Sequence, residues 1–371
     1  MTPARSVDSA ARFVRPELRE LGAYHLDQTE CRFKLDQNEV PWDLPSRVKR
    51  AVAEQLLASN WAGYPDFHAD RLRRALADRH RWPLEGVLAG NGSNELLGIS
   101  LEAFAVPGGE VLGVLPSFGL YEMFVRRAGA RSRFLAPRED LGLQIDELRA
   151  EIARDPSRPL ILCSPNNPTG AAATVDEVAS LLDELRAPMI LDNAYGEFCR
   201  YDYRPLLERY ENLVIFRTFS KAWSLGGMRL GYLLAHPQLV EELIKVKLPY
   251  NLNHAASLAG VAALENAAVA ERRVSVLCGR REQFRDLFVE VGFDVLPSEG
   301  NFLLVRAQPL ADRSGESSGE LVRRVRNGLA ERGILVRDVS GYPGLAGSFR
   351  IGVGSGGALR ATRSALKEIL R

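Results

Sequence analysis

The chain has 371 residues, of which 46% are hydrophobic and 26% are charged, the ordinary composition of a soluble globular protein. Its 48 basic and 47 acidic residues leave a formal net charge of +1, which gives no electrostatic reason to expect nucleic acid or an anionic membrane as a partner. The length is sufficient for one large domain and a smaller one.

Neither the cysteines nor the N-terminus indicates a special environment. The four cysteines and five histidines show no metal-ligand or Cys-x-x-Cys spacing, so we expect reduced thiols and no metal site. Residues 1–29 are polar and charged without an apolar core, which predicts an arm and not a secretory signal. No run approaches the roughly 18 apolar residues that a membrane span needs. These features predict a cytoplasmic protein.

Helices and short apolar runs alternate after the arm. Residues 46–58 and about 69–80 predict two helices, with Ser46 as the cap of the first. Four apolar runs, separated by helical stretches such as 174–186, predict strands: Val111–Leu115, Leu160–Cys163, Met189–Asp192 and Leu213–Phe216. Runs that are apolar on both faces are typical of buried parallel strands. In such an α/β sheet, the ligand binds beyond the carboxyl ends of the strands.

The C-terminal third has a different pattern. It predicts, in order, a long charged helix over 267–290, a strand over 302–305, a loop over 306–320, a helix over 320–332 and strands at about 334–337 and 348–353. This order predicts a smaller α+β domain.

Lys221 lies among small, hydroxylic and aromatic residues. A lysine amine attacks a carbonyl only when it is neutral, and partial burial near another cation lowers its pKa toward that state. The hydroxyls of Thr218 and Ser220 and the guanidinium of Arg229 would meanwhile hold a dianionic phosphate. Pyridoxal phosphate, an aldehyde that bears a phosphate, would use both halves of this segment. An ordinary lysine near a helix start is the alternative.

Two more motifs follow predicted strand ends or turns. Ser93 and Asn94 follow a glycine turn and predict caps of a helix, whose free N–H groups and dipole favour an anion; a simple capped helix is the alternative. Asp192 ends an apolar strand, where a carboxylate can pair with a pyridinium nitrogen or merely cap a helix. Tyr195, three residues later, would hydrogen-bond the phenolic oxygen of the ring.

The remaining candidates are an amide, an aromatic ring and two arginines. Asn167 projects from the rigid turn Ser164-Pro165-Asn166-Asn167-Pro168-Thr169-Gly170. Phe118 follows Pro116-Ser117 and would either stack on a flat ring or pack in the core. Arg337 and Arg350 each end an apolar strand, where an arginine either binds carboxylate or phosphate in bidentate fashion or is simply solvated.

Taken in order, these motifs resemble those of the fold-type I pyridoxal-phosphate enzymes, the aspartate aminotransferase superfamily. Within it the chain looks most like the histidinol-phosphate aminotransferase family. The similarity includes Arg15-Pro16-Glu17-Leu18, Lys34-Leu35-Asp36-Gln37-Asn38-Glu39, Tyr64-Pro65-Asp66 and Phe349-Arg350-Ile351. It implies an α/β fold whose large domain has a mostly parallel seven-stranded sheet flanked by helices, plus a smaller α+β domain. The implied bounds are an arm at 1–29, a small domain at 30–58 and 267–371, and a large domain at 59–266.

The resemblance also implies roles. Lys221 would form a Schiff base with pyridoxal 5′-phosphate and move the substrate proton, with histidinol phosphate as amino donor, 2-oxoglutarate as acceptor and a homodimer as the working form. The other implied roles are Asp192 at the pyridine nitrogen; Asn167 and Tyr195 at the ring oxygen; Phe118 on the ring; Ser93, Asn94, Thr218, Ser220, Arg229 and the partner's Tyr64 at the cofactor phosphate; Arg350 at the substrate carboxylate; and Tyr24 and Arg337 at the substrate phosphate.

The chain departs from the family pattern after Asn38-Glu39, where Val40-Pro41-Trp42 follows. Trp42 and Trp61 are expected to add bulk near the substrate entrance, and the Ser/Gly-rich loop at 312–319 is longer than usual. The alternatives are therefore an aromatic amino-acid aminotransferase whose pocket Trp42 lines, and a threonine-phosphate-type decarboxylase. A non-catalytic cofactor-binding regulator is a third alternative, but no segment is left over for the DNA-binding domain that such proteins carry.

Overall fold

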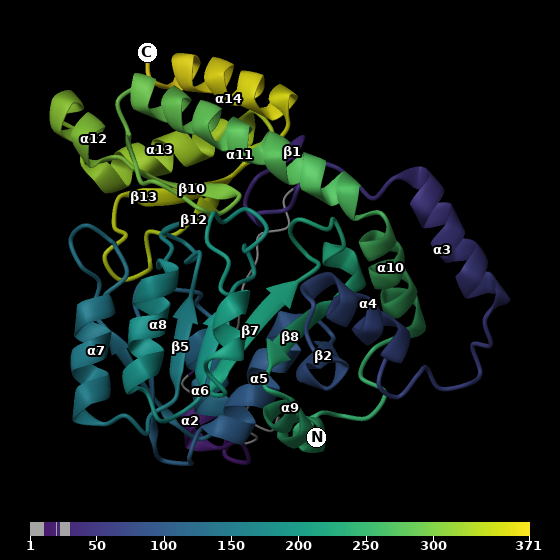
Figure 1. The fold of residues 1–371 in the computed structure, drawn as a ribbon. Coiled ribbons are helices and arrows are strands. Elements are labelled where there is room, and N and C mark those ends of the chain that lie inside the picture. The colour runs from purple at the N-terminus through teal and green to yellow at the C-terminus, as the bar shows by residue number, and fades with distance from the viewer. Residues whose placement is uncertain (1–10, 20, 23–29) are drawn as a thin grey trace, which may run out of the picture.

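A seven-stranded sheet forms the centre of the fold in this computed structural model, which describes residues 11–19, 21–22 and 30–371 (Figure 1). The strand order is β2-β8-β7-β6-β5-β3-β4. The bounds are β2 Val87–Gly90, β3 Glu110–Val114, β4 Arg131–Leu135, β5 Leu160–Cys163, β6 Met189–Asp192, β7 Leu213–Thr218 and β8 Gly231–Ala235. Strand β8 is antiparallel to β2 and β7, and the other pairs are parallel. The predicted mostly parallel sheet is confirmed.

Alternate residues of these strands enter two separate hydrophobic clusters. Leu160 and Leu162 of β5 belong to one cluster, whereas Ile161 and Cys163 belong to the other. Successive side chains of a strand point to opposite faces, so a strand that is apolar at every position has both faces covered. The helices that accompany this sheet in the chain are α3 Ser46–Ala58, α4 Asp70–His80, α5 Ser93–Phe104, α6 Tyr121–Arg127, α7 Ile145–Arg154, α8 Val175–Glu184, α9 Pro237–Val246 and α10 His254–Glu265.

The C-terminal part contains a second sheet of four strands in the order β12-β13-β10-β9. Its elements are α11 Ala267–Glu290, β9 Asp294–Val295, β10 Phe302–Arg306, α12 Gln308–Ser314, α13 Ser318–Glu331, β11 Ile334–Leu335, β12 Arg337–Asp338, β13 Ser348–Gly352 and α14 Gly356–Ile369. Strand β1 (Phe33–Lys34) pairs with β11, and the short helix α2 (Pro16–Arg19) lies near α6. Figure 1 shows the second sheet above the ends of β5 and β7.

Three local predictions were wrong. Pro45 precedes α3 as its N-cap without a side-chain bond, so Ser46 is the first helical residue instead of the cap. Gly92, at φ 84°, is the N-cap of α5, so neither Ser93 nor Asn94 caps it. The stretch predicted as a loop over 306–320 contains the helix α12.

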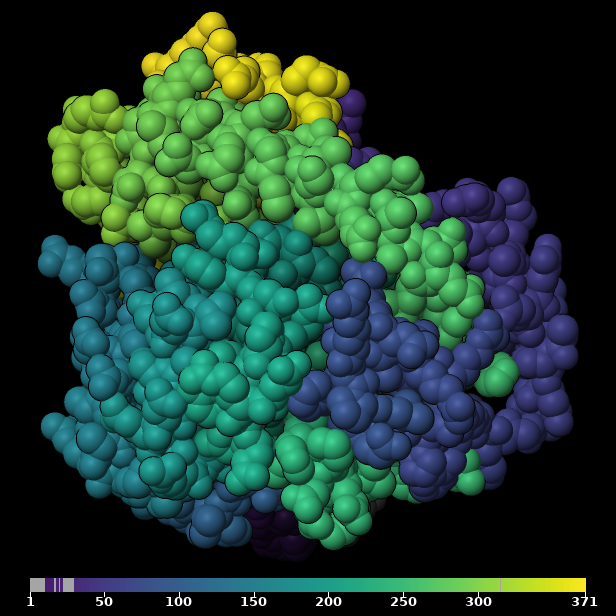
Figure 2. Space-filling view, in the orientation of Figure 1, coloured from purple at the N-terminus to yellow at the C-terminus, as the bar shows by residue number. Residues whose placement is uncertain are grey.

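Figure 2 shows the green and yellow C-terminal part covering one end of the teal part that carries the large sheet. Helix α3 packs against α10, which also contacts α4, although α3 was predicted with the small domain. The division at residues 29, 58 and 266 stays a prediction. Among the residues that the structure describes, no helix is both long enough and apolar enough to span a membrane.

Candidate active site

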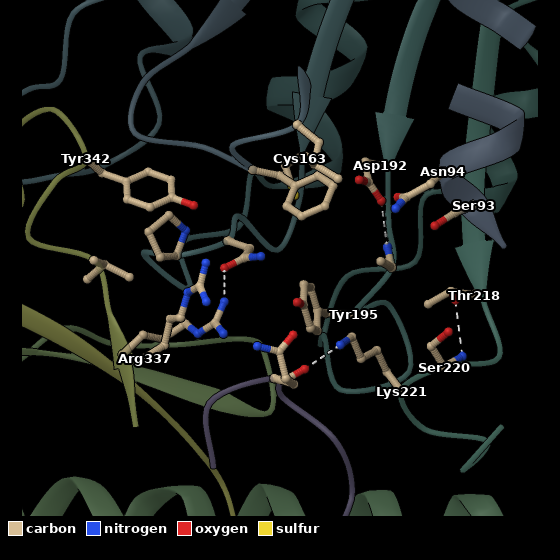
Figure 3. A pocket seen from close by; sticks show the side chains of 18 of the residues that line it. Ser93, Asn94, Cys163, Asp192, Tyr195, Thr218, Ser220, Lys221, Arg337 and Tyr342 are labelled. Carbon is tan, nitrogen blue, oxygen red and sulfur yellow. Dashed lines mark hydrogen bonds between the residues drawn. The ribbon is translucent and has the colours of Figure 1, made fainter. Parts of the chain in front are cut away.

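A cavity of about 290 Å³ lies where the carboxyl ends of the parallel strands face the four-stranded sheet (Figure 3). All the predicted site residues that the structure describes line it, except Tyr64. The lining comprises Gln37, Ser93, Asn94, Phe118, Leu120, Cys163, Asn167, Pro168, Asp192, Ala194, Tyr195, Thr218, Ser220, Lys221, Arg229, Arg337, Val339, Tyr342 and Arg350. Residues from nearly the whole length of the chain therefore meet at the edge predicted for a ligand.

One side of the cavity is suited to an anion. Helix α5 begins there at Ser93, and because its cap is a glycine, its first N–H groups have no side-chain partner. A Cβ atom at Gly92 would lie 2.8 Å from Nη2 of Arg229, so the glycine lets the guanidinium approach the helix start. Arg229 also donates to Ser220 Oγ at 3.4 Å. Thr218, at the end of β7, completes this group.

Asp192 lies at the floor of the cavity and is 5% exposed. Its Oδ2 accepts a hydrogen bond from Tyr121 Oη at 2.6 Å, and its Oδ1 accepts one from the backbone N–H of Ala194 at 3.2 Å. Burial raises the pKa of this carboxyl, while the bond from Tyr121 opposes that shift. A positively charged nitrogen beside Asp192 would relieve the cost of burying the carboxylate.

Lys221 faces Asp192 and Tyr195 across the cavity (Figure 3). Its Nζ donates to the backbone carbonyl of Gln37 at 2.7 Å and lies 5.8 Å from the centre of the Tyr195 ring. The residue is half-buried and lines the cavity. Burial first, and the charge of Arg350 second, lower the pKa of Lys221 to about 7. The neutral amine is therefore accessible near pH 7, which suits a nucleophile or a proton carrier.

Tyr195 and Asn167 lie between Lys221 and the arginines. Tyr195 Oη accepts a hydrogen bond from Asn38 Nδ2 at 3.0 Å, and burial raises the pKa of Tyr195 to about 12. Asn167 Oδ1 accepts from Arg350 Nη1 at 2.5 Å, and Arg350 also donates to the backbone carbonyl of Asp36. The bond between Asn167 and Arg350 joins the segment after β5 of the large sheet to β13 of the small sheet, and the other two bonds reach the segment after β1.

The opposite side of the cavity was only partly foreseen. Arg337 and Arg350 pair in register on β12 and β13, so both arginines reach the cavity from neighbouring strands. Val339 and Tyr342, from the loop that follows β12, were not predicted and carry no motif. Gln37 belongs to a motif noticed in the sequence, but its contribution is a backbone carbonyl, which side-chain chemistry does not reveal.

The aromatic residues expected at or near the site have different outcomes. Trp42 does not line the cavity; its ring packs beneath Arg273 and Arg280 of α11, at 5.8 Å and 5.6 Å. Phe118 lines the cavity and also makes an edge contact with Tyr121, so ligand and core packing are both open to it. Tyr64 is 82% exposed and stacks on Tyr250 outside the cavity, and Tyr24 lies outside the described residues.

Fold and site together match a known class. A sequence profile described as aminotransferase class I and II matches residues 32–369, and enzymes of this class use pyridoxal 5′-phosphate. The chain is 32% identical to a histidinol-phosphate aminotransferase from Caldanaerobacter subterraneus, covering 96% of this chain and 98% of the relative. It is 36% identical to one from Chlorobium phaeovibrioides, covering 92% and 93%. The chain belongs to the class I and II aminotransferases and, within them, to the histidinol-phosphate aminotransferase family.

A solved structure supports the fold. Histidinol-phosphate aminotransferase from Sinorhizobium meliloti, in complex with pyridoxal 5′-phosphate, superposes with a TM-score of 0.86. It is 22% identical, and the match covers 100% of this chain and 99% of that one. The predicted fold class, an aminotransferase fold with a mostly parallel seven-stranded sheet, is thus confirmed.

Proposed function

We propose that the protein transfers the amino group of histidinol phosphate to 2-oxoglutarate, with pyridoxal 5′-phosphate in the cavity around Lys221. The observation that carries the proposal is the position of Lys221, whose amine shares one cavity with the buried carboxylate of Asp192 and with two arginines. The names of the curated relatives supply the donor.

The residues present fit this cofactor. Asp192 is a buried carboxylate without a cationic hydrogen-bond partner among the described residues, and it would hold the protonated ring nitrogen. The start of α5 and the side chains around it would hold the phosphate; this group comprises Ser93, Asn94, Thr218, Ser220 and Arg229. Asn167 and Tyr195 would bind the ring oxygen, and Phe118 would cover one face of the ring. When bound, the cofactor supplies an electron sink for the substrate carbon.

Lys221 is the residue that would move the proton. A primary amine with a pKa of about 7 accepts and returns a proton with little driving force in either direction, as general acid–base catalysis requires. The Gln37 carbonyl orients Nζ by accepting its hydrogen bond at 2.7 Å. Tyr195, with its pKa raised to about 12, stays protonated near neutral pH and can donate from Oη to an oxyanion.

Two arginines would each bind an anionic group of a substrate. Arg337 would bind the phosphate of histidinol phosphate, and Arg350 a carboxylate of the 2-oxo acid, since guanidinium forks bind both anions in bidentate fashion. Tyr24 is proposed to join Arg337 at the phosphate. Arg350 already bonds Asn167, so substrate and cofactor contacts would meet at one amide.

We also propose a homodimer in which Tyr64 reaches the partner's cofactor phosphate. Support comes from the exposed aromatic group around it: Trp61, Tyr64, Phe67 and Tyr250 are each at least 40% exposed. Such a patch is unusual on the surface of a monomer. Light scattering measures the mass of the protein in solution and so distinguishes a monomer from a homodimer. A cytoplasmic location is part of the same proposal.

A donor panel tests the function. With 2-oxoglutarate as acceptor, we expect histidinol phosphate to yield glutamate at a much higher kcat/KM than phenylalanine, tyrosine or histidine. Preference for phenylalanine or tyrosine would favour the aromatic aminotransferase, although Trp42 no longer supports that reading. Release of CO₂ from a phosphorylated donor without formation of glutamate would favour the decarboxylase.

A further inference from the structure

A second cavity lies behind the two loops that carry Tyr195 and Lys221. It shares no lining residue with the active-site cavity, yet it is lined by their sequence neighbours, including Gly196, Glu197, Arg217 and Trp223. Successive side chains of β7 point to opposite faces of the sheet, which partly explains why the two cavities are separate. Thr218 faces the active site, while Arg217 faces the second cavity.

Glu197 joins the two loops through one oxygen atom. Its Oε1 forms an ion pair with Arg217 Nη2 at 2.8 Å and accepts a hydrogen bond from Trp223 Nε1 at 3.0 Å. Glu197 is two residues after Tyr195, and Trp223 is two residues after Lys221. A single carboxylate therefore holds the Tyr195 loop against the Lys221 loop.

Arg217 extends the connection to the floor of the active site. Its Nη1 donates to Asn193 Oδ1 at 2.8 Å, and Asn193 Nδ2 donates to the backbone carbonyl of Ser164 at 2.6 Å. Asn193 is the neighbour of Asp192. A Cβ atom at Gly196 would lie 2.1 Å from Asn193 Oδ1 and 2.6 Å from Arg217 Nη1, so this position has no room for a side chain.

These groups are shielded from water, which makes the contacts directional and costly to break. The side chains of Arg217 and Glu197 are 11% and 10% exposed, and Trp223 is 2% exposed. Hydrogen bonds to buried charges are stronger and shorter than those on a surface. The ring of Trp223 is fixed further by Arg79, whose guanidinium lies 4.7 Å from it.

We infer that Glu197, with Arg217 and Trp223, is a positioning residue that fixes Tyr195 and Lys221 relative to each other across the active site. Figure 3 shows those two side chains facing the same space from separate loops. The inference rests on the proposed function for the roles of Tyr195 and Lys221. Neither Glu197 nor Trp223 lines the active-site cavity, so their effect on the reaction passes through the loops.

The central variant is Glu197→Gln, which retains the size of the side chain and weakens both bonds. Trp223→Phe removes only the N–H donor. Asp202→Asn is the matched control, because Asp202 lines the same second cavity but bonds Arg204 and not Glu197, Arg217 or Trp223. Each variant is studied as the holoenzyme, with thermal unfolding recorded to show that it is folded.

We expect Glu197→Gln to lower kcat roughly 10- to 100-fold, since small misplacements of reacting groups have effects of that size. KM for the donor should change less than about twofold, because the substrate-binding residues Arg337 and Arg350 are unchanged. The pH midpoint of the visible absorbance change of the holoenzyme should move by about half a unit or more, since it depends on how Lys221 and Tyr195 lie around the cofactor. Asp202→Asn should match the wild type in all three measurements.

Trp223→Phe should lower kcat in the same direction, and combining it with Glu197→Gln should add little, because both changes act on one contact. A wild-type kcat and midpoint in Trp223→Phe, or equal effects in Asp202→Asn, would overturn the inference. If Glu197→Gln does not fold, Trp223→Phe decides alone, since it retains both charges. A wild-type enzyme that is inactive with histidinol phosphate would instead contradict the proposed donor, and the absorbance midpoint would still test the inference.

Discussion

The two ends of the active-site cavity are built in different ways. We call one end the sheet end. Here Asp192, Thr218 and Lys221 lie at or just after the ends of buried strands, and backbone hydrogen bonds fix the register of these strands. At the other, the loop end, Arg337 lies on a two-residue strand and Tyr342 on the loop after it. The sheet end cannot move without disturbing the core, whereas the loop end can vary. We therefore expect changes at the sheet end to reduce activity with every donor, and changes at the loop end to alter the choice of donor.

The largest effect should come from Lys221→Ala. Without the amine, turnover should fall roughly 100- to 10,000-fold with every donor, because a general acid–base group contributes about that much. Borohydride treatment followed by peptide mass analysis should find a pyridoxyl group on residue 221 in the wild type and none in the variant. Lys245→Ala, on an exposed face of α9, is the control and should behave as wild type. Retained activity and labelling in Lys221→Ala would contradict the role of Lys221, and with it the view that the sheet end carries out the chemistry.

Asp192→Asn should have the next largest effect. The amide retains the shape of the side chain but loses the charge beside the ring nitrogen, so kcat should fall roughly 100-fold or more with all donors. Tyr121→Phe removes the hydroxyl that bonds Oδ2 and should cost about tenfold or less. Steady-state kinetics with two donors tests both. A loss confined to one donor would place Asp192 among the specificity residues instead.

Arg337→Ala should separate the two ends. Loss of a charge-assisted contact to phosphate should lower kcat/KM for histidinol phosphate by roughly 10- to 100-fold. A phosphate-free aromatic donor should be affected little. Arg360→Ala, an exposed arginine on α14, provides the control. Equal losses with both donors would mean that Arg337 does not read the phosphate.

The smallest effect is a pH dependence. The pKa of Lys221 is lowered to about 7 by burial first and by Arg350 second, so the neutral amine is present above that pH and lost below it. The rate at which the apoenzyme takes up pyridoxal phosphate, followed by absorbance, should rise up to about pH 7 and then level off. A rate that continues to rise far above pH 7 would indicate a lysine with an ordinary pKa.

The same contrast explains how much could be predicted from the sequence. Strands β5 and β6 were predicted to the residue, because an uninterrupted apolar run that stops at Ser164 or at Asp192 has few other structures. Helix α12 was missed because its composition is typical of a loop. Ala311 is nevertheless buried, and α12 packs against α13, so tertiary contacts decide its conformation.

Side chains that depend on tertiary placement were beyond the sequence. Tyr342 and Val339 have no motif, and they reach the cavity only because the loop after β12 lies over the large sheet. Trp42 was expected at the substrate entrance because of its place in the family's sequence pattern, but the arginines of α11 hold its ring elsewhere. Glu197 and Arg217 lie close in sequence to Tyr195 and Thr218, but only the structure reveals their pairing.

The most direct test of the account compares histidinol phosphate with histidinol as amino donors of the wild-type enzyme. The two molecules differ only in the phosphate, so their ratio of kcat/KM isolates what the loop end recognises. Since bidentate contacts between arginine and phosphate are worth several kcal/mol, we predict a ratio of roughly 100 or more in favour of the phosphorylated donor. A ratio near one, with both donors active, would contradict the division of the cavity into a sheet end for chemistry and a loop end for phosphate.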